Sequence, residues 1–403
     1  MNILFIHQNF PAQFKNLANK LYDIGHNVKA LTQNKIQLGN IQSIVYPIDK
    51  INSTNIHFLC KDLETKIIRG EASMQALIDL KKNGYYPNIT IAHGGWGESL
   101  YVKDIFPKTK LITYFEYYYS SEGQDFNFDP EFTLKDYKYK ALIRNKNAHN
   151  LLNFESSDSI LTPTRWQRST IPNFINKDIH VIHDGINTNR LLPNPNIKIK
   201  LNNGHFLSKK IPIVTFTNRN FEPLRGYHSF MRALVHLQKL NKEFHALLIG
   251  GDGNGYGKKT DAGSSYKDIF FNEVKNDLDT SRVHFLGTLN YENYINILQI
   301  SSVHVYLSYP FVLSWSLLEA MSVGCPIVGS KTGPVMEVIK DKENGLLAEF
   351  FDYTSIAEIT NEVLCNQKLS NMLGVNARNH IKNLYDLETI CLPKQVDLVH
   401  SLS

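Results

Sequence analysis

Residues 303–339 contain an order of elements that few folds accommodate. An apolar run at 303–307 ends in a turn with a proline, and a helix is then predicted over 314–321, ending before a Gly-Cys-Pro sequence. A short β-branched strand at 327–329 follows, and a Gly-Pro pair opens another helix at 334–339. Strand, turn, helix and strand in this order are typical of the βαβ unit of an open parallel sheet. In such a sheet, ligands bind outside the carboxyl ends of the strands.

The rest of the chain repeats this alternation of strands and helices. In the first half we predict strands at 3–7, 28–32, 89–93 and 111–115, a strand and turn at 179–186, and helices at 12–22, 65–82 and 134–147. In the second half we predict strands at 213–217, 246–249 and 283–287, and helices at 227–240, 291–300, 354–366, 370–384 and 388–401. The first strand and helix are joined without a Gly-x-Gly-x-x-Gly sequence, which argues against a dinucleotide-binding dehydrogenase. The pattern therefore predicts an α/β fold.

Length, charge and cysteine usage limit the class of protein. The 403 residues exceed one ordinary core and fit two domains of about 200 residues each. No apolar stretch approaches the about 20 residues that a transmembrane helix needs. The four cysteines form no Cys-x-x-Cys pair, which favours reduced thiols and a cytoplasmic location. A net charge of +5 favours anionic ligands such as nucleotides, phospholipid headgroups or lipid-linked diphosphates, but it is too small to indicate nucleic-acid binding.

Composition also divides the chain. We expect a first domain at 1–190, a linker at 191–210 that is rich in Asn, Pro and Lys, and a second domain at 211–385. The chain has one Asp-x-Asp sequence, Asp277-Leu278-Asp279, and it lies at a predicted helix end rather than after a strand. We therefore expect a surface feature there and no metal site.

The segment 314–347 resembles the donor-binding segment of the retaining family-4 glycosyltransferases of the GT-B fold, also called group 1 glycosyltransferases. That family carries two glutamates separated by seven residues, followed by Pro-x-Glu-x-Val and Asn-Gly-Leu-Leu. Glu319 matches the second glutamate, which in the family holds the nucleotide ribose, and Glu337 and Asn344-Gly345 match the later positions. The first glutamate is absent, because Phe311 stands eight positions before Glu319.

The residues around this departure give further candidate donor contacts. The family's usual glycines are replaced here by Val312 and Ser314. The backbone N–H groups from Val312 through Leu313 and Ser314 to Trp315 could still hold a phosphate or sugar at a helix N-terminus. Taken alone, Glu319 has a second interpretation as a solvated helix carboxylate.

The loop after the strand at 213–217 carries two cations. In the family this loop presents an Arg and a Lys to the donor diphosphate; Arg219 matches the first, and Arg225 stands where the Lys usually is. Two fixed cations beside a helix N-terminus stabilise the charge that grows on a departing diphosphate, so the resemblance implies a catalytic role for both. Arginines on a loop are otherwise ordinary surface charge. Gly251, in the glycine-rich loop 250–257, is expected at the same donor site.

The first half of the chain supplies candidates for the acceptor side. Its sequences HQNFPAQF, HGGWGESLYVKDIFP and TYFEYYY resemble the N-terminal domain of a subgroup of this family. His93 and Glu116 each end a predicted strand, and a carboxylate among aromatic side chains should have a raised pKa and could accept a proton. Histidines satisfied in a core and tyrosines that only pack are the alternatives. The predicted acceptor contacts are Phe10, Gln13, Gly95, Trp96 and Tyr118.

The resemblance implies two Rossmann-like domains facing across a cleft, with a final helix at about 386–403 packing back on the first domain. The implied activity is retaining transfer of a sugar from a nucleotide-diphosphate-sugar donor to a glycan or lipid-linked acceptor in surface polysaccharide or glycoconjugate biosynthesis. We expect no cofactor or metal, no nucleic-acid partner, and peripheral contact with the inner face of a membrane. A degenerate GT-B protein that acts as a binding partner and a GT-B sugar-nucleotide epimerase remain as alternatives.

Overall fold

The computed structural model describes residues 1–48, 55–201, 204, 206–253, 255 and 264–402. The chain forms two compact units: unit 1 consists of Met1–Gly185 with Leu387–Ser403, and unit 2 of Ile186–Asp386. Residues 254, 256 and 257 of the glycine-rich loop 250–257 lie outside the described residues. No helix in the described part of the chain is both long and apolar enough to cross a membrane.

Unit 1 is built on a seven-stranded parallel sheet with the order β3-β2-β1-β4-β5-β6-β7. The strands are β1 (Asn2–Ile6), β2 (Asn27–Thr32), β3 (Gln42–Val45), β4 (Ile89–His93), β5 (Lys110–Tyr114), β6 (Ser159–Thr162) and β7 (Asp178–Val181). The central strands β1 and β4 are buried on both faces and almost continuously apolar, as is typical of parallel strands covered by helices.

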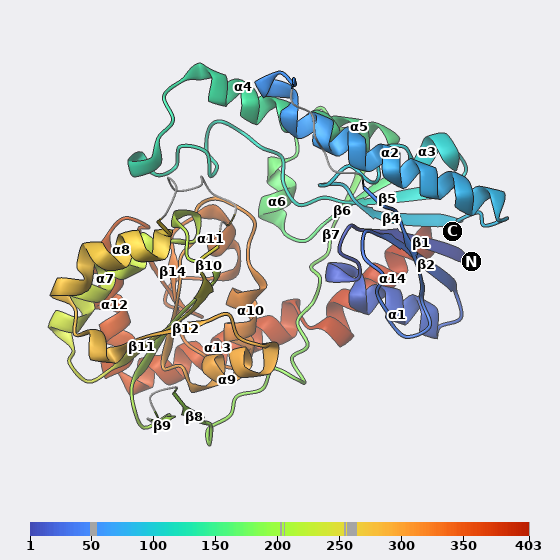
Figure 1. Ribbon diagram of the computed structural model, residues 1–403. Helices are drawn as coiled ribbons and strands as arrows, with labels where there is room; N and C mark the ends of the chain where they lie inside the picture. Colours follow the sequence, from blue (N-terminus) through green and yellow to red (C-terminus); the bar gives the residue numbers. More distant parts are fainter. Residues whose placement is uncertain (49–54, 202–203, 205, 254, 256–263, 403) are drawn as a thin grey trace. The chain divides into compact units, whose positions relative to one another are not determined.

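Helices cover both faces of this sheet (Figure 1). On one face, α1 (Lys15–Asp23) and α14 (Leu392–Ser401) pack against Ile3 and Phe5. On the other face, α2 (Lys61–Lys82) and α3 (Val102–Ile105) pack against Leu4 and Ile6. The other helical segments of unit 1 are η1 (Ala12–Phe14), η2 (Phe58–Cys60), η3 (Pro130–Phe132), α4 (Tyr137–Asn145), α5 (Ala148–Ser156), α6 (Arg165–Thr170) and the π-helix η7 (Leu387–Cys391).

The predicted helix at 134–147 corresponds to α4, and a second helix, α5, which was not predicted, follows it from Ala148. The break falls at Asn147, whose side chain accepts a hydrogen bond from the Tyr119 backbone N–H at 2.9 Å and donates one to the Tyr119 carbonyl at 2.7 Å. Because this side chain pairs with a backbone group 28 residues away, tertiary structure ends α4 where helical propensity alone would continue it.

Unit 2 contains a six-stranded parallel sheet with the order β12-β11-β10-β13-β14-β15. The strands are β10 (Ile213–Asn220), β11 (His245–Gly251), β12 (Val283–Gly287), β13 (Val303–Tyr306), β14 (Ile327–Ser330) and β15 (Leu346–Ala348). In Figure 1, α7, α8 and α12 lie on one side of it and α9, α10 and α13 on the other. The helical segments are η4 (Pro223–Arg225), α7 (Tyr227–Leu240), α8 (Tyr266–Val274), η5 (Lys275–Asp277), η6 (Thr280–Arg282), α9 (Tyr291–Ile300), α10 (Trp315–Ser322), α11 (Gly333–Val338), α12 (Tyr353–Cys365) and α13 (Gln367–Leu384).

The segment 191–210, predicted as a linker, belongs to unit 2. It forms an antiparallel pair, β8 (Lys198–Lys200) and β9 (Phe206–Ser208), and Leu201 and Leu207 are buried in the same cluster as Ile213. The physical reason is visible in the alternation of Ile and Leu with polar residues over 197–201, a strand pattern of period two that the Asn- and Pro-rich composition obscured.

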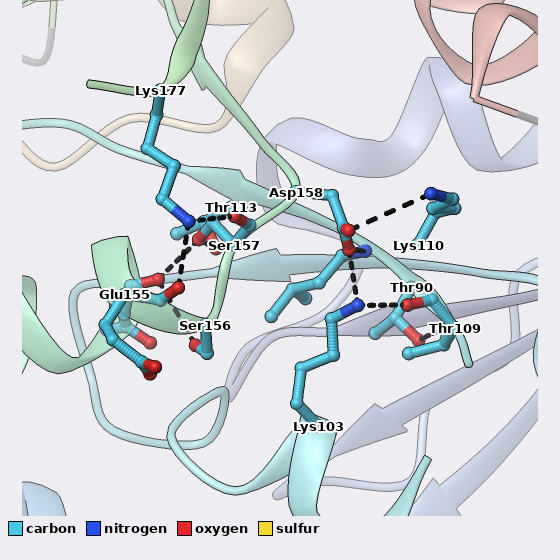
Figure 2. A network of polar contacts seen from close by, with 12 residues as sticks. Thr90, Lys103, Thr109, Lys110, Thr113, Glu155, Ser156, Ser157, Asp158 and Lys177 are labelled. Atoms are coloured by element: carbon cyan, nitrogen blue, oxygen red, sulfur yellow. Dashed lines mark hydrogen bonds and ion pairs between the residues drawn. The ribbon is translucent and has the colours of Figure 1, made fainter. Parts of the chain in front are cut away.

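In unit 1, the amino ends of β5 and β6 are tied together by the polar network drawn in Figure 2. Asp158 accepts hydrogen bonds from the Lys103 ammonium at 2.5 Å and the Leu111 backbone N–H at 2.7 Å. Burial raises the pKa of this carboxyl, but these hydrogen bonds outweigh burial and hold the pKa below its usual range. Lys177 donates to the backbone carbonyls of Glu155 and Ser157 beside it. This edge of the sheet is therefore fixed by internal contacts.

Candidate active site

Each sheet has one point at which the strand order reverses. In unit 2 the chain proceeds from β10 through β11 to β12 in one direction and from β13 through β14 to β15 in the other. In unit 1 it proceeds from β1 through β2 to β3, and β4 lies on the opposite side of β1. Ligands of open α/β sheets bind at such switch points, outside the carboxyl ends of the strands. The edges after β10 and β13, and after β1 and β4, are therefore the candidate sites.

Arg225 is fixed at the switch point of unit 2. Its Nη1 donates a hydrogen bond of 2.9 Å to the Oγ of Ser308, just beyond β13, and its guanidinium carbon lies 5.6 Å from the centre of the Phe311 ring. Gly226, with a left-handed φ of +74°, turns the chain from η4 into α7, and a Cβ there would lie 2.3 Å from the Leu307 Cβ. Arg225 is only 9% exposed, so the edge of the sheet holds a cation in one position.

Arg219 is not on a loop, contrary to the sequence-based expectation. β10 continues to Asn220, because a register shift after Thr217 lets Asn220 pair with Gly251 on β11. The Arg219 side chain is exposed. A Cβ on Gly251 would lie 2.8 Å from the Asn220 Oδ1 and 3.5 Å from the Arg219 carbonyl oxygen, so these two candidate donor contacts are neighbours on adjacent strands.

Glu319 lies in the second turn of α10 and is 7% exposed. The Tyr291 hydroxyl donates to its Oε1 at 2.7 Å, and the Tyr294 hydroxyl donates to its Oε2 at 2.8 Å. Both tyrosines lie in the first turn of α9, three residues apart and therefore on one face. Burial raises the pKa of Glu319, and the two tyrosine hydrogen bonds oppose this shift without cancelling it. The alternative of a solvated surface carboxylate is therefore wrong.

The stretch before α10 is partly occupied by internal contacts. The backbone N–H of Ser314 donates to the Tyr306 hydroxyl at 2.9 Å, so it does not point freely at a phosphate as expected. Leu313 packs its side chain into the core of unit 2. Val312 is half-buried, and Trp315, the first residue of α10, is 45% exposed. Among these residues, the Trp315 side chain is the one most accessible to a ligand.

Several polar partners in unit 2 were not identified from the sequence. Ser308 follows the apolar run at 303–307 and was not proposed as a site residue, although a serine directly after a central parallel strand is itself a signal. Tyr291 and Tyr294 were read only as part of a helix, although their spacing places two hydroxyls on one face. Asn344, which matches a family position, closes the turn after α11 by accepting from the Lys340 N–H and donating to the Val338 carbonyl.

His93 occupies the switch point of unit 1. It is the last residue of β4, is 3% exposed, and its ring lies 5.0 Å from that of His7, which follows β1. The His93 Nδ1 accepts the Gly95 backbone N–H at 3.0 Å, which assigns the proton to Nε2. Nε2 lies 3.5 Å from the Oε2 of Glu116, a half-exposed carboxylate just after β5. The structure therefore brings the two predicted catalytic residues of unit 1 together.

The loop after His93 is packed tightly against α2. A Cβ on Gly97, which has a φ of +110°, would lie 2.1 Å from the Lys66 carbonyl oxygen. A Cβ on Gly95 would lie 2.8 Å from the His93 ring, so only a glycine at this position leaves room for the ring. The half-buried Trp96 stacks on His93, with ring centres 5.9 Å apart, and the Lys66 ammonium lies 5.2 Å from the centre of the Trp96 ring.

Two other predicted acceptor contacts have mainly internal roles. Phe10 is 1% exposed and packs on Phe5 in the core of unit 1, so its side chain does not face an acceptor, contrary to expectation. Gln13 hydrogen-bonds His7. Burial and the neighbouring His93 nevertheless lower the pKa of His7 to about 3, so His7 is neutral at physiological pH.

Tyr118, the last predicted acceptor contact, is half-buried. Its ring stacks on Phe154 at 6.4 Å between centres, and its backbone N–H donates to the Thr170 hydroxyl. Burial raises the pKa of Tyr118. One face of the Tyr118 ring therefore packs inside unit 1, as in the alternative that these tyrosines only pack.

The Asp-x-Asp sequence lies at the opposite edge of the unit 2 sheet, before β12 begins. Asp279 accepts hydrogen bonds from the Ser281 hydroxyl at 2.5 Å and from the Arg282 Nε at 2.7 Å, which lower its pKa to about 2. This aspartate caps η6, as expected of a surface feature.

Two family models match the chain. One is described as the glycosyl transferase family 4 group and matches residues 24–191; the other is described as glycosyl transferases group 1 and matches residues 199–380. Together they cover most of both units and leave out residues 1–23 and 381–403 at the two ends of the chain.

Curated relatives match over part of their length. N-acetyl-α-D-glucosaminyl L-malate synthase of Bacillus anthracis is 28% identical over 216 residues, which are 53% of this chain and 52% of the relative. An uncharacterized glycosyltransferase of Methanocaldococcus jannaschii is 28% identical over 239 residues, 58% of this chain and 56% of the relative. The chain thus spans about half the length of the curated relatives it matches.

Solved structures match over the whole chain. Sucrose-phosphate synthase from Thermosynechococcus elongatus superposes with a TM-score of 0.73 at 16% identity and covers 100% of this chain and 99% of its own. HepE from Anabaena, solved in complex with UDP and glucose, superposes with a TM-score of 0.68 at 15% identity and covers 100% and 99%. At these identities the likeness shows the fold.

Proposed function

Because the chain belongs to the group 1 glycosyltransferases and has their GT-B fold, we propose that it transfers a sugar, with retention, from a nucleotide-diphosphate-sugar to a glycan or lipid-linked acceptor. The relative named N-acetyl-α-D-glucosaminyl L-malate synthase and the HepE complexes with UDP support a donor of this class. We place the reaction in surface polysaccharide or glycoconjugate biosynthesis, in the cytoplasm, with peripheral contact to the membrane.

One observation carries this proposal: the buried Arg225 guanidinium held at the switch point of unit 2 by Ser308 and Phe311. As the bond from the diphosphate to the anomeric carbon breaks, negative charge grows on the leaving oxygen. A cation already in place needs no reorganisation to stabilise that charge, and a site closed to water strengthens the interaction. Arg219 supplies a second, exposed cation that can bind the diphosphate.

We assign Glu319 to binding of the nucleotide rather than to the reacting bond. Its two oxygens each accept one tyrosine hydroxyl, and a carboxylate can accept about four hydrogen bonds, so lone pairs remain for ribose hydroxyls. The tyrosines fix the orientation of those lone pairs. In unit 1, we assign to His93 and Glu116 contacts with the reacting sugar or acceptor.

We expect transfer to proceed without a divalent cation, because the arginines can neutralise the diphosphate and Asp279 is used internally. The check is the transfer rate after EDTA treatment, with and without added manganese. Loss of activity in EDTA and its recovery with manganese would contradict this expectation.

The proposal is tested by a thermal-shift panel of nucleotide sugars, followed by release of nucleoside diphosphate in the presence of candidate acceptors. A stabilising donor and acceptor-dependent release support transfer. Release of free nucleotide and sugar without an acceptor would favour the epimerase alternative. Binding without any turnover would favour the degenerate binding protein.

A further inference from the structure

Helix α4 of unit 1 differs from its neighbours because none of its nine residues is buried. The segment 135–146 contains five cationic residues and one acidic one: Lys135, Lys138, Lys140, Arg144, Lys146 and Asp136. The Tyr137 side chain, between these lysines, is 83% exposed, more than any other exposed large hydrophobic residue in the described chain. Propensity and local capping by Asp136 support this helix, but packing against a core does not.

The charges of α4 are only partly neutralised. Lys138 pairs with Asp136 at 2.9 Å, and Lys140 with Glu122 at 3.8 Å, in both cases between exposed side chains. Lys135 and Arg144 form no ion pair with another described residue. Exposed pairs of this kind are weak and exchange readily with another anion. The segment therefore presents a net positive surface.

An apolar residue extends this surface. Phe58 of η2 is 41% exposed, and its ring meets that of Tyr139 edge to face with centres 6.4 Å apart. The Asn145 amide donates to the Leu59 carbonyl at 3.1 Å, so η2 and α4 are held together. Figure 1 shows α4 at the outer edge of unit 1, beside the start of α2.

We propose that this surface, the α4 face formed by Phe58, Lys135, Tyr137, Lys138, Lys140 and Arg144, docks on a membrane containing anionic phospholipids. Lysine and arginine heads are attracted to the negative leaflet, while tyrosine and phenylalanine rings insert at the headgroup level. Charge alone would suit any acidic partner. The largely exposed Tyr137 ring among the lysines favours a lipid interface, where the body of the ring meets apolar surroundings and its hydroxyl stays hydrated. The proposal assigns a surface to the peripheral membrane contact of the proposed function, and it does not depend on the sugar transfer itself.

The test is cosedimentation of the full chain with vesicles of phosphatidylcholine alone and with phosphatidylglycerol added, at low and high salt. We expect binding only to the anionic vesicles, weakened by salt. Replacing Lys135, Lys138, Lys140 and Arg144 by serine should lower the partition coefficient by about 6 × 10²-fold, from a factor of about five for each charge. Replacing Lys239, Lys242, Lys275 and Lys368, four exposed lysines of unit 2, by serine gives a matched change of net charge that should leave binding unchanged. Tyr137→Ala should weaken binding severalfold.

Because α4 buries no residue, each variant should keep the thermal unfolding midpoint of the wild type. Equal binding to neutral and anionic vesicles, no binding to either, or equal loss in the unit 2 control would overturn the proposal. Loss of binding in the four-serine variant with unchanged binding of Tyr137→Ala would show that the α4 face binds vesicles through charge alone. That result would overturn the insertion of the aromatic rings at the headgroup level.

Discussion

Arg225→Ala should lower kcat by about 10²–10³-fold with only a modest change in donor KM. The diphosphate charge that Arg225 meets is larger in the transition state than in the bound donor, so the lost interaction appears mainly in kcat. The measurement is single-turnover transfer at saturating donor, which separates the chemical step from product release. Arg219→Ala, which removes an exposed cation, should have a smaller effect.

Two variants make the Arg225 result specific. Arg225→Lys keeps the charge but loses the planar guanidinium that reaches Ser308 and stacks on Phe311, so it should recover only part of kcat. Arg282→Ala removes an arginine at the opposite edge of the sheet, where it pairs with Asp279, and should leave kcat unchanged. If Arg219→Ala and Arg225→Ala both kept wild-type kcat, other groups would hold the diphosphate and the assignment of this edge would be wrong.

Glu319→Gln should raise donor KM by about 10- to 100-fold and change kcat little, since a hydrogen bond to a charged group contributes about 1.5–3 kcal/mol. The ribose is held equally in the ground and transition states, so its loss falls on binding. Donor KM should also depend on pH. Burial raises the pKa of Glu319, and the acceptor form is the carboxylate, so donor affinity should be lost as pH falls through that raised pKa.

Tyr294→Phe provides the sharper control for this prediction. It removes a hydrogen bond that lowers the pKa of Glu319, so the pH at which donor affinity is lost should move upward. A purely structural tyrosine would change affinity without moving that pH. Donor KM measured against pH for the wild type and Tyr294→Phe therefore distinguishes the two roles.

The parallel sheets were predictable because their strands are apolar on both faces and the helices between them keep a clear period. The strand ranges 89–93 and 283–287 and the helix ranges 227–240 and 291–300 agree with β4, β12, α7 and α9. The GT-B fold is confirmed by the solved structures. The edge of each sheet that carries the candidate site was also predictable from the order of the strands. Polar residues directly after apolar parallel strands must lie at the carboxyl edge of the sheet.

What the sequence could not supply are contacts that depend on packing between distant segments. Phe10 looked like a loop aromatic but fills the core beside Phe5. The Ser314 N–H looked available for a phosphate but donates to the Tyr306 hydroxyl, and no local sequence pattern predicts this hydrogen bond. The two tyrosine hydroxyls on Glu319 come from a helix whose first turn lies 25 or more residues earlier. Such pairings are set by tertiary structure rather than by periodicity.

The most direct measurement is a calorimetric titration of nucleoside diphosphates into the wild type, Arg225→Ala and Glu319→Gln. The account predicts saturable binding by the wild type to at least one nucleoside diphosphate, with weaker binding in both variants and unchanged binding in Arg282→Ala. Wild-type affinity retained in both Arg225→Ala and Glu319→Gln would contradict the central claim that the switch point of unit 2 is the nucleotide site.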